Sequence, residues 1–165
     1  MPSHDVLIIG AGLAGQRAAL AAADAGATVA IMSKVHPVRS HSNAAAGGIN
    51  AALNPDDSWE SHAFDTVKGS DYLGDQDAIE IFTAEAPGDI YQLEHWGCVF
   101  SRNDEGRLDQ RPFGAAGSPR TVYAADITGH VLIQVLYEQL QRRMTAGLAV
   151  YEEYFAFRLV IDDGR

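Results

Sequence analysis

The chain has 165 residues, 47% of them hydrophobic and 21% charged, which is ordinary for one soluble domain with a sizeable core. Its formal net charge of −10 excludes electrostatic attraction to nucleic acid or to anionic lipid. Any anionic ligand must therefore be held locally, by backbone N–H groups and a helix N-terminus.

Cys98 is the only cysteine, which excludes an internal disulfide and a zinc cluster and fits a reducing compartment. We expect no metal. No run approaches the roughly 20 apolar residues that span a bilayer, and the chain does not begin with a signal-peptide pattern. We therefore expect no direct insertion into a membrane.

The N-terminal residues predict a strand, a glycine turn, a helix and a second strand. Asp5–Ile9 is a short buried strand, Gly10–Gly15 a glycine turn and Leu13–Ala25 an alanine-rich helix that Gly26 ends. Thr28–Met32 is the next strand. This βαβ order predicts an α/β fold with a parallel sheet and a right-handed crossover.

The next segment combines an irregular loop and an expected helix. Val35–Asn43 contains a proline and reads as a loop, whereas Ala44–Leu53 is helical in composition. Gly47 and Gly48 cost about 1 kcal/mol each in a helix relative to alanine. We infer that a neighbouring group approaches closely there.

Caps and spacing predict the remaining elements. In chain order these are a helix starting at the capping box Asp57–Glu60, a helix capped by Asp75, a helix begun by Pro87 and ended by Gly97, a hairpin within Val99–Asp109 around Glu105-Gly106, a loop over Gln110–Arg120, a helix capped by Thr128, and strands over Ala149–Glu152 and Phe155–Ile161.

The last residues predict an interrupted hairpin. Asp162-Asp163-Gly164 reads as a turn after the Phe155–Ile161 strand, and no return strand follows. We expect the chain to be a piece of a longer protein.

The glycine turn is the first candidate site. Gly10-Ala11-Gly12-Leu13-Ala14-Gly15 places GxGxxG after a strand and at a helix start, the context that supports a dinucleotide. Gly10 permits the tight turn, Gly12 lets a pyrophosphate approach the backbone and Gly15 lets helix and strand pack closely. A glycine turn without a ligand is the alternative.

The second strand ends without the acidic residue that often binds a ribose. Ser33 can still form a hydrogen bond to a ribose, and Lys34 can pair with a phosphate. A solvated strand end is the alternative. These two residues do not decide between dinucleotides.

Three motifs in order resemble the flavoprotein subunit of succinate dehydrogenase and fumarate reductase. The first is Ser33-Lys34 followed by Arg39-Ser40-His41-Ser42, where the family has Ser or Thr last, and by Ala45-Ala46-Gly47-Gly48; the second is Gly69–Ala78; the third is Gln110–Gly114 with Arg120-Thr121 and Ala125–His130. The resemblance covers essentially the whole chain. It implies an incomplete Rossmann-like FAD-binding domain, GxGxxG βαβ, with inserted helices and a small hairpin.

The resemblance implies a covalent bond from His41 to the 8α carbon of FAD, which raises the flavin's reduction potential. Beyond Gly10–Gly15, Ser33 and Lys34, the cofactor-binding residues it implies are Ser40, His41, Ser42, Ala45, Gly47, Gly48, Phe155 and Ala156. In this interpretation a helix containing Gly47-Gly48 packs against the flavin diphosphate region; a helix crossing is the alternative. The backbone of Tyr154–Ala156 pairs with the adenine edge.

The resemblance further implies oxidation of succinate to fumarate by hydride transfer to FAD, within electron transport and the tricarboxylic acid cycle. Electrons would pass to an iron-sulfur subunit and quinone, with the chain held peripherally at the cytoplasmic face of a membrane through partner subunits and a membrane anchor. Phe113 would line the dicarboxylate pocket, or anchor a loop in the core. Ala46 replaces the family's Gln or Glu, which leaves the direction of reaction open and keeps fumarate reductase as an alternative.

In this interpretation the main catalytic arginine and the capping and helical domains belong to segments outside this chain. We expect residues 1–165 to be the N-terminal part of the FAD-binding domain and to be inactive alone. Three further alternatives remain: a non-covalent L-aspartate oxidase-like enzyme, an inactive binding module and a nicotinamide-dependent enzyme. Other polar side chains have structural interpretations at least as strong as chemical ones. Arg111 fits a surface or structural ion pair as well as a substrate clamp, and Asp126 and His130 fit capping and packing. His62 and His95 fit ordinary surface or core histidines, and Cys98 a buried small hydrophobe.

Overall fold

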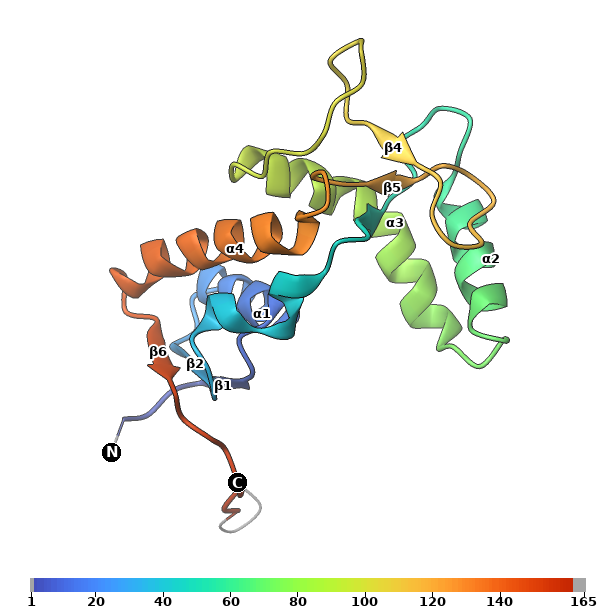
Figure 1. The fold of residues 1–165 in the computed structure, drawn as a ribbon. Coiled ribbons are helices and arrows are strands. Elements are labelled where there is room, and N and C mark those ends of the chain that lie inside the picture. Colours follow the sequence, from blue (N-terminus) through green and yellow to red (C-terminus); the bar gives the residue numbers. More distant parts are fainter. Residues whose placement is uncertain (1, 162–165) are drawn as a thin grey trace. The chain divides into compact units, whose positions relative to one another are not determined.

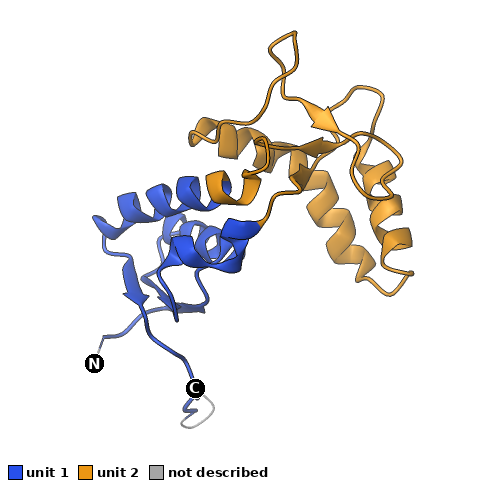
Figure 2. Cartoon of the chain, viewed as in Figure 1, with its two compact units in different colours: residues 1–44, 132–165 blue, residues 45–131 orange. Residues whose placement is uncertain are grey.

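The computed structural model describes residues 2–161, so the expected turn at Asp162–Gly164 lies outside the described residues. The chain forms two compact units (Figure 2). Unit 1 combines residues 1–44 with 132–165, and unit 2 is residues 45–131. Each unit is described by itself below.

Unit 1 is built on a parallel sheet of three strands in the order β1-β2-β6 (Figure 1). The strands are β1 (Val6–Ile9), β2 (Val29–Ser33) and β6 (Ala149–Glu152). Helix α1 (Leu13–Asp24) joins β1 to β2, as the glycine turn and the alanine-rich stretch predicted. The expected α/β architecture is confirmed.

One face of this sheet carries the core of unit 1. The register aligns Val6 with Val29, Ile8 with Ile31 and Ile31 with Val150, so these side chains share one side. Ala19 of α1 and Leu140 of α4 (Thr128–Met144) pack against them, both fully buried. Residues 132–144 of α4 belong to unit 1.

The other face of β1 is open. Leu7 and Ile9 are 51% and 55% exposed, so the expectation of a wholly buried strand is wrong for half of its residues. Alternate residues of a strand point to opposite faces. The described residues cover one of these faces and leave the Leu7 and Ile9 side accessible.

The expected strand over Phe155–Ile161 is absent. Tyr154 N–H still donates to Ser33 O at 3.0 Å, but residues 155–161 form no ladder and their large side chains are exposed. A strand is stabilised by hydrogen bonds to a neighbouring strand. The structure provides no such neighbour for this segment among the described residues.

The chain between β2 and unit 2 differs from the expected loop and helix. The loop contains two short 3₁₀ turns, Pro37–Arg39 and His41–Ala44. The predicted helix over Ala44–Leu53 is wrong, because Ile49–Asn50 is strand β3. Gly48 has φ +115°, which no right-handed helix accommodates.

Unit 2 contains an antiparallel sheet in the order β3-β5-β4, with β4 at Gln110–Arg111 and β5 at Thr121–Val122. A Cβ added at Gly48 would lie 2.5 Å from Thr121 Cγ2. The predicted close approach at this glycine is therefore confirmed. The neighbouring group, however, is strand β5 and not a packed helix.

The two helices of unit 2 begin where the caps predict. Ser58 accepts from Ser61 N–H at 3.1 Å at the start of α2 (Trp59–Gly69), and Asp75 accepts from Ala78 N–H at 3.1 Å at the start of α3 (Gln76–His95). Pro87 does not begin a new helix but lies inside α3.

The continuity of α3 through Pro87 has a tertiary cause. A proline lacks the N–H of one helical hydrogen bond and is disfavoured inside helices. The residues that α3 buries recur at helical spacing on both sides of Pro87, and packing of this stripe outweighs the local preference. The stripe consists of Ile79, Thr83, Ala86 and Ile90.

The hairpin and the last helix also form, but Thr128 is the first residue of that helix and not its cap, since its hydroxyl accepts from Ala124 N–H at 3.0 Å. Arg102 and Leu108 pair as an antiparallel bridge around Gly106, which has φ +77°. The expected loop after it contains the two residues of β4. Helix α4 buries the apolar residues that recur at helical spacing, among them Leu132, Val135, Leu136 and Leu140.

A buried ion cluster holds the beginning of α2 to β5. The Arg120 side chain is fully buried; its Nε donates to Asp57 Oδ2 at 2.9 Å and its Nη2 to Asp57 Oδ1 at 2.8 Å. Its Nη1 donates to Asp65 at 2.8 Å. Burial alone would raise the pKa of Asp57, but the hydrogen bonds and charge of Arg120 hold that pKa below its usual range.

Candidate functional site

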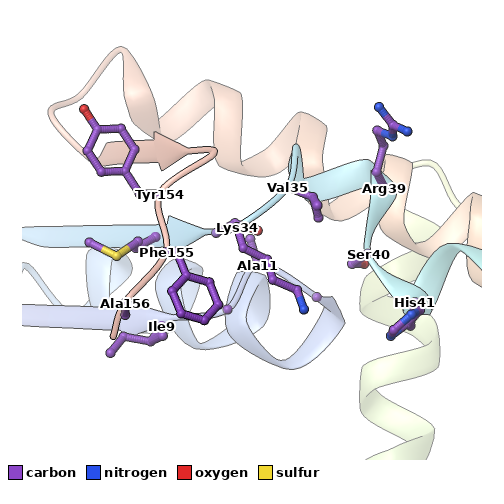
Figure 3. Close-up of a pocket in the computed structure, with 14 residues that line it drawn as sticks. Ile9, Ala11, Lys34, Val35, Arg39, Ser40, His41, Tyr154, Phe155 and Ala156 are labelled. Carbon is purple, nitrogen blue, oxygen red and sulfur yellow. The ribbon is translucent and has the colours of Figure 1, made fainter. Parts of the chain in front are cut away.

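A cavity of about 350 Å³ lies at the carboxyl ends of β1 and β2 in unit 1 (Figure 3). This is the edge at which parallel α/β sheets bind ligands. Three segments line it, the glycine turn, the end of β2 with the loop that follows, and the segment after β6. The lining residues are Ile9–Gly12, Met32–Val35, Arg39–His41 and Tyr154–Ala156.

The glycine turn has the geometry expected of a dinucleotide turn. Gly10 has φ +108° and its N–H donates to Met32 O at 2.8 Å. A Cβ added at Gly15 would lie 1.8 Å from Gly10 O, which leaves room for hydrogen only. Gly10 thus makes the turn and Gly15 brings α1 against it, as predicted.

The N-terminus of α1 is suited to an anion. The N-cap residue is Gly12, which has no side chain to cap the helix, and no acidic residue lies in the first turn. The N–H groups at this end carry a partial positive charge.

The charge of the lining also favours an anion. No described residue that lines the cavity is acidic, whereas Lys34 and Arg39 are cationic. The chain as a whole has a formal charge of −10, so this local balance opposes the global one. A diphosphate fits such a lining.

The end of β2 contributes to the cavity as predicted. Ser33 is only 6% exposed, which removes the alternative of a solvated strand end for this residue. Its carbonyl accepts from Tyr154 N–H and so joins β2 to the segment that brings Phe155 and Ala156 to the cavity. Lys34 is exposed.

Ser40 and His41 line the same cavity, from the 3₁₀ turns after β2. In Figure 3 His41 lies at the end of the cavity opposite Tyr154. The Ser40 hydroxyl is buried and has no hydrogen-bond partner within the described structure. Buried hydroxyls without partners are rare, and a polar cofactor group would satisfy this one. The residues present therefore fit a dinucleotide.

Ser42, Leu13, Ala14 and Gly15 do not line the cavity. Instead the Ser42 hydroxyl accepts from Leu13 N–H at 3.3 Å. The structure thus ties the turn that contains His41 to the first residue of α1. That Ser42, Leu13 and Ala14 contact a cofactor stays a prediction.

The other predicted residues, Ala45, Gly47, Gly48 and Phe113, lie in unit 2. Arg111 Nη2 donates to Gly47 O at 2.8 Å and to Ala46 O at 3.2 Å, and its guanidinium lies 4.2 Å from the Tyr123 ring centre. Within the described residues these contacts with backbone carbonyls take the place of the ion pair considered for Arg111, and its role as a substrate clamp stays a prediction.

Phe113 lies against Gly47 within unit 2. A Cβ added at Gly47 would lie 3.0 Å from the Phe113 ring. The ring is 53% exposed, so it is not the core anchor that the alternative interpretation required. It also lines a cavity of about 240 Å³ together with His62, Asp65 and Arg120.

Sequence reasoning missed several residues of the main cavity. Ile9, Met32, Val35 and Arg39 also line it. All four are near neighbours of predicted residues, and that proximity was the available signal. Arg39 in particular supplies a second cation.

A polar cluster beside this cavity had no signal in the sequence. Tyr137 OH donates to Glu152 Oε1 at 3.1 Å, and His36 Nε2 lies 3.6 Å from the same oxygen. Burial and the hydrogen bond to Glu152 raise the pKa of Tyr137. The cluster joins α4, β6 and the loop after β2, which lie far apart in sequence.

His62 and Cys98 are buried, as the packing interpretation expects. His62 is 4% exposed and packs edge-on against Phe82; burial, aided by the charge of Arg120, lowers its pKa. Cys98 is buried, and burial raises the pKa of its thiol to about 12. No helix among residues 2–161 is long and apolar enough to cross a bilayer.

The model of the FAD binding domain family matches residues 5–165, so the chain belongs to this family. The chain is 49% identical over 164 residues to the fumarate reductase flavoprotein subunit of Mycobacterium tuberculosis, covering 98% of the chain and 28% of that protein. It is 46% identical over 170 residues to the succinate dehydrogenase flavoprotein subunit of Rickettsia bellii, with 97% and 28% covered. The chain thus spans little more than a quarter of these relatives.

Solved structures agree with this assignment. Mycobacterium smegmatis Sdh1 superposes with a TM-score of 0.94 at 34% identity, covering 99% of this chain and 30% of that one. A variant of E. coli quinol fumarate reductase FrdA gives 0.92 at 41% identity, with 98% and 28% covered. The Rossmann-like FAD-binding fold and the likeness to flavoprotein subunits of succinate dehydrogenase and fumarate reductase are therefore confirmed.

Proposed function

We propose that this chain is the N-terminal part of the FAD-binding domain of a flavoprotein subunit that oxidises succinate to fumarate and passes the electrons to an iron-sulfur subunit and quinone. The observation that carries the proposal is the cavity that joins the glycine turn to His41. The names of the most similar relatives support the choice of reaction.

Within this proposal the residues of unit 1 bind and orient the cofactor. The N–H groups at Gly12 and the start of α1 receive the diphosphate, with Lys34 and Arg39 adding positive charge. Ser33 binds the ribose, and the backbone at Phe155 and Ala156 meets the adenine. The unpaired Ser40 hydroxyl binds a polar atom of the cofactor.

His41 is proposed to be the covalent attachment residue, through its imidazole and the 8α carbon of FAD. It lines the cavity and lies on the solvent-accessible part of its 3₁₀ turn, so a cofactor can reach it. FAD, when bound, supplies the two-electron acceptor that no side chain provides.

The residues of unit 2 are proposed to shape the dicarboxylate site. Phe113 presents an exposed ring, and Gly47 leaves space for it because any side chain there would meet the ring. Arg111 holds the carbonyls of Ala46 and Gly47 and so fixes the segment on which Phe113 rests. The main catalytic arginine is proposed to lie outside residues 1–165, together with the capping and helical domains.

The partners and location follow from the same proposal. The subunit would bind succinate or fumarate, join an iron-sulfur subunit and a membrane anchor, and lie peripherally at the cytoplasmic face of a membrane. Nucleic acid is not a proposed partner, since the charge of −10 opposes it.

The binding of FAD and its covalent attachment to His41 are tested on the protein produced from its full coding sequence. We expect a flavin absorption band, and flavin fluorescence that remains with the polypeptide after acid precipitation and denaturing electrophoresis. His41→Ala should retain flavin absorption but release the flavin on precipitation. A wild-type protein that releases its flavin would contradict the covalent linkage and favour the L-aspartate oxidase-like alternative.

Fumarate reduction is a second candidate because one relative with 49% identity is named a fumarate reductase flavoprotein subunit. Alanine at position 46 offers no side-chain hydrogen bond to bias either direction. Rates of succinate oxidation and fumarate reduction, measured on one preparation with matched dyes, decide between the directions. Residues 1–165 alone should reduce no dye with succinate. Such a reduction would overturn the proposal that the main catalytic arginine lies outside these residues.

A further inference from the structure

The hydroxyl groups of Ser40 and Ser42, on both sides of His41, lie near the position that a side chain at Gly12 would occupy. A Cβ added at Gly12 would lie 3.2 Å from Ser42 Oγ and 3.9 Å from Ser40 Oγ. Gly12 is also the N-cap residue of α1. The absence of a side chain at Gly12 therefore lets the His41 turn approach the start of the helix.

Ser42 makes a bond at this point of approach. Its Oγ accepts from Leu13 N–H at 3.3 Å, across 29 positions of the chain. The first N–H groups of a helix have no partner within the helix, and Gly12 has no side chain to supply one. Ser42 thus serves as a capping group from another segment.

Two backbone hydrogen bonds shape the loop that contains the His41 turn. Asn43 N–H donates to Ser40 O at 3.0 Å and Ser40 N–H to Pro37 O at 3.1 Å, both within the same loop. These bonds shape the turn but do not attach it to the sheet or to α1. The Ser42–Leu13 bond joins the turn to an element whose position is set by the core.

We propose that Ser42 is a positioning residue that anchors the His41 turn on the N-terminus of α1, and that Gly12 provides the space for this contact. Gly12 would then serve two purposes, the approach of the diphosphate and the placement of the covalent attachment residue. The inference deepens the proposed function, on which its relation to the cofactor rests.

The first experiment measures amide hydrogen exchange of the full-length protein without cofactor. Ser42→Ala should accelerate exchange at Leu13 and across residues 40–44 by about 3- to 10-fold, the effect expected from losing one hydrogen bond. Ser42→Thr keeps the hydroxyl and should exchange like the wild type. Unchanged exchange across residues 40–44 in Ser42→Ala would overturn the anchor.

The second experiment measures the share of flavin that stays attached after denaturation, and separately the affinity of the apoprotein for FAD. Ser42→Ala should lower the attached share several-fold while changing the affinity less, and Ser42→Thr should restore it. If the wild type attaches no flavin, the proposed linkage fails, yet the exchange experiment still decides the anchor. Equal attachment in Ser42→Ala and wild type would overturn the role of Ser42.

The role of Gly12 is tested by a double-mutant cycle with the same exchange readout. Gly12→Ala should disturb residues 40–44 in the wild-type background, and less in Ser42→Ala, where the neighbouring Oγ is absent. Effects that simply add would show that Gly12 does not provide the space for Ser42.

Discussion

Unit 1 and unit 2 owe their internal order to different interactions. In unit 1 alanine, valine and leucine side chains pack α1 and α4 against a parallel sheet, and glycines bring the backbone to the cavity. In unit 2 the strands are two residues long, and a buried arginine with two carboxylates joins β5 to α2. Apolar packing thus holds the elements that form the cavity at the glycine turn, whereas ion pairs of Arg120 hold the elements beside Phe113.

This difference is visible in how each unit depends on single atoms. A hydrogen at Gly15 cannot be replaced by carbon without moving α1 or the turn. The Arg120 guanidinium cannot be removed without leaving Asp57 and Asp65 unpaired. The predictions below test the two kinds of dependence, in order of decreasing effect.

Arg120→Ala should have the largest effect. Removing one partner of a buried ion cluster costs about 3–5 kcal/mol, because the remaining charges lose their compensation. Chemical denaturation followed by circular dichroism measures the loss. Arg107→Ala is the matched control, since Arg107 pairs with Glu105 in the open, 76% and 69% exposed, and should change the free energy of unfolding by less than about 1 kcal/mol. Equal losses would contradict a structural role for burial of Arg120.

Gly15→Ala should come next and should act on unit 1. Its Cβ would lie 1.8 Å from Gly10 O, and such overpacking costs about 1–3 kcal/mol or more. Affinity for FAD should fall together with stability, because the turn and the helix N-terminus must separate. Fluorescence titration with FAD and thermal unfolding measure both.

Gly88→Ala is the control for a glycine without such a constraint. Gly88 lies within α3, an added Cβ meets nothing within 4 Å, and its φ is not positive. This substitution should stabilise the protein by about 1 kcal/mol through helix propensity. A loss in Gly88→Ala as large as that in Gly15→Ala would remove the steric explanation.

A change of pH should have a smaller effect on the free energy of unfolding, through His62 of unit 2. The pKa of His62 is lowered below its usual value of 6.5, first by burial and then by the charge of Arg120, while Asp57 and Asp65 oppose this. The neutral form is therefore favoured in the folded state. The resulting stability is present above pH 6.5 and is lost as the pH falls from there toward the folded pKa, because the unfolded chain binds the proton more readily. Unfolding free energies between pH 7.5 and 5 should decline less in His62→Gln than in the wild type.

The smallest expected effect is a change in the rate at which Cys98 of unit 2 is chemically labelled. Its pKa of about 12 leaves almost no thiolate at pH 8 in the folded protein. Iodoacetamide should therefore modify Cys98 only when unit 2 opens, with faster labelling in Arg120→Ala than in Gly15→Ala. Equal labelling rates in the two variants would show that the units open together.

Local patterns predicted the elements correctly where short-range interactions decide the conformation. The alternation of strand, glycine turn and alanine-rich helix led to the βαβ unit, and the caps at Ser58 and Asp75 located the starts of α2 and α3. The errors were a helix at Ala44–Leu53, a break at Pro87 and a strand over Phe155–Ile161. In each case contacts distant in sequence, or their absence, decided the conformation.

The candidate site shows the same division. Residues from GxGxxG and from the motif around His41 line one cavity, because they follow the ends of β1 and β2. Arg39 was missed, and no spacing rule connects Tyr137, Glu152 and His36. Side-chain pairs formed across the fold leave no periodic trace in the chain.

By itself the sequence determined the geometry of the glycine turn, because Gly10 and Gly15 are required by local backbone geometry and steric exclusion. It also determined that an anionic cofactor must be bound by backbone donors, since the net charge of −10 offers no general attraction. Only the tertiary structure decided that Ser42 bonds to Leu13, that no carboxylate lines the cavity among the described residues, and that Arg120 is buried between two aspartates. These facts depend on which segments fold together, and the free energy that brings them together comes from packing that no short stretch of sequence contains.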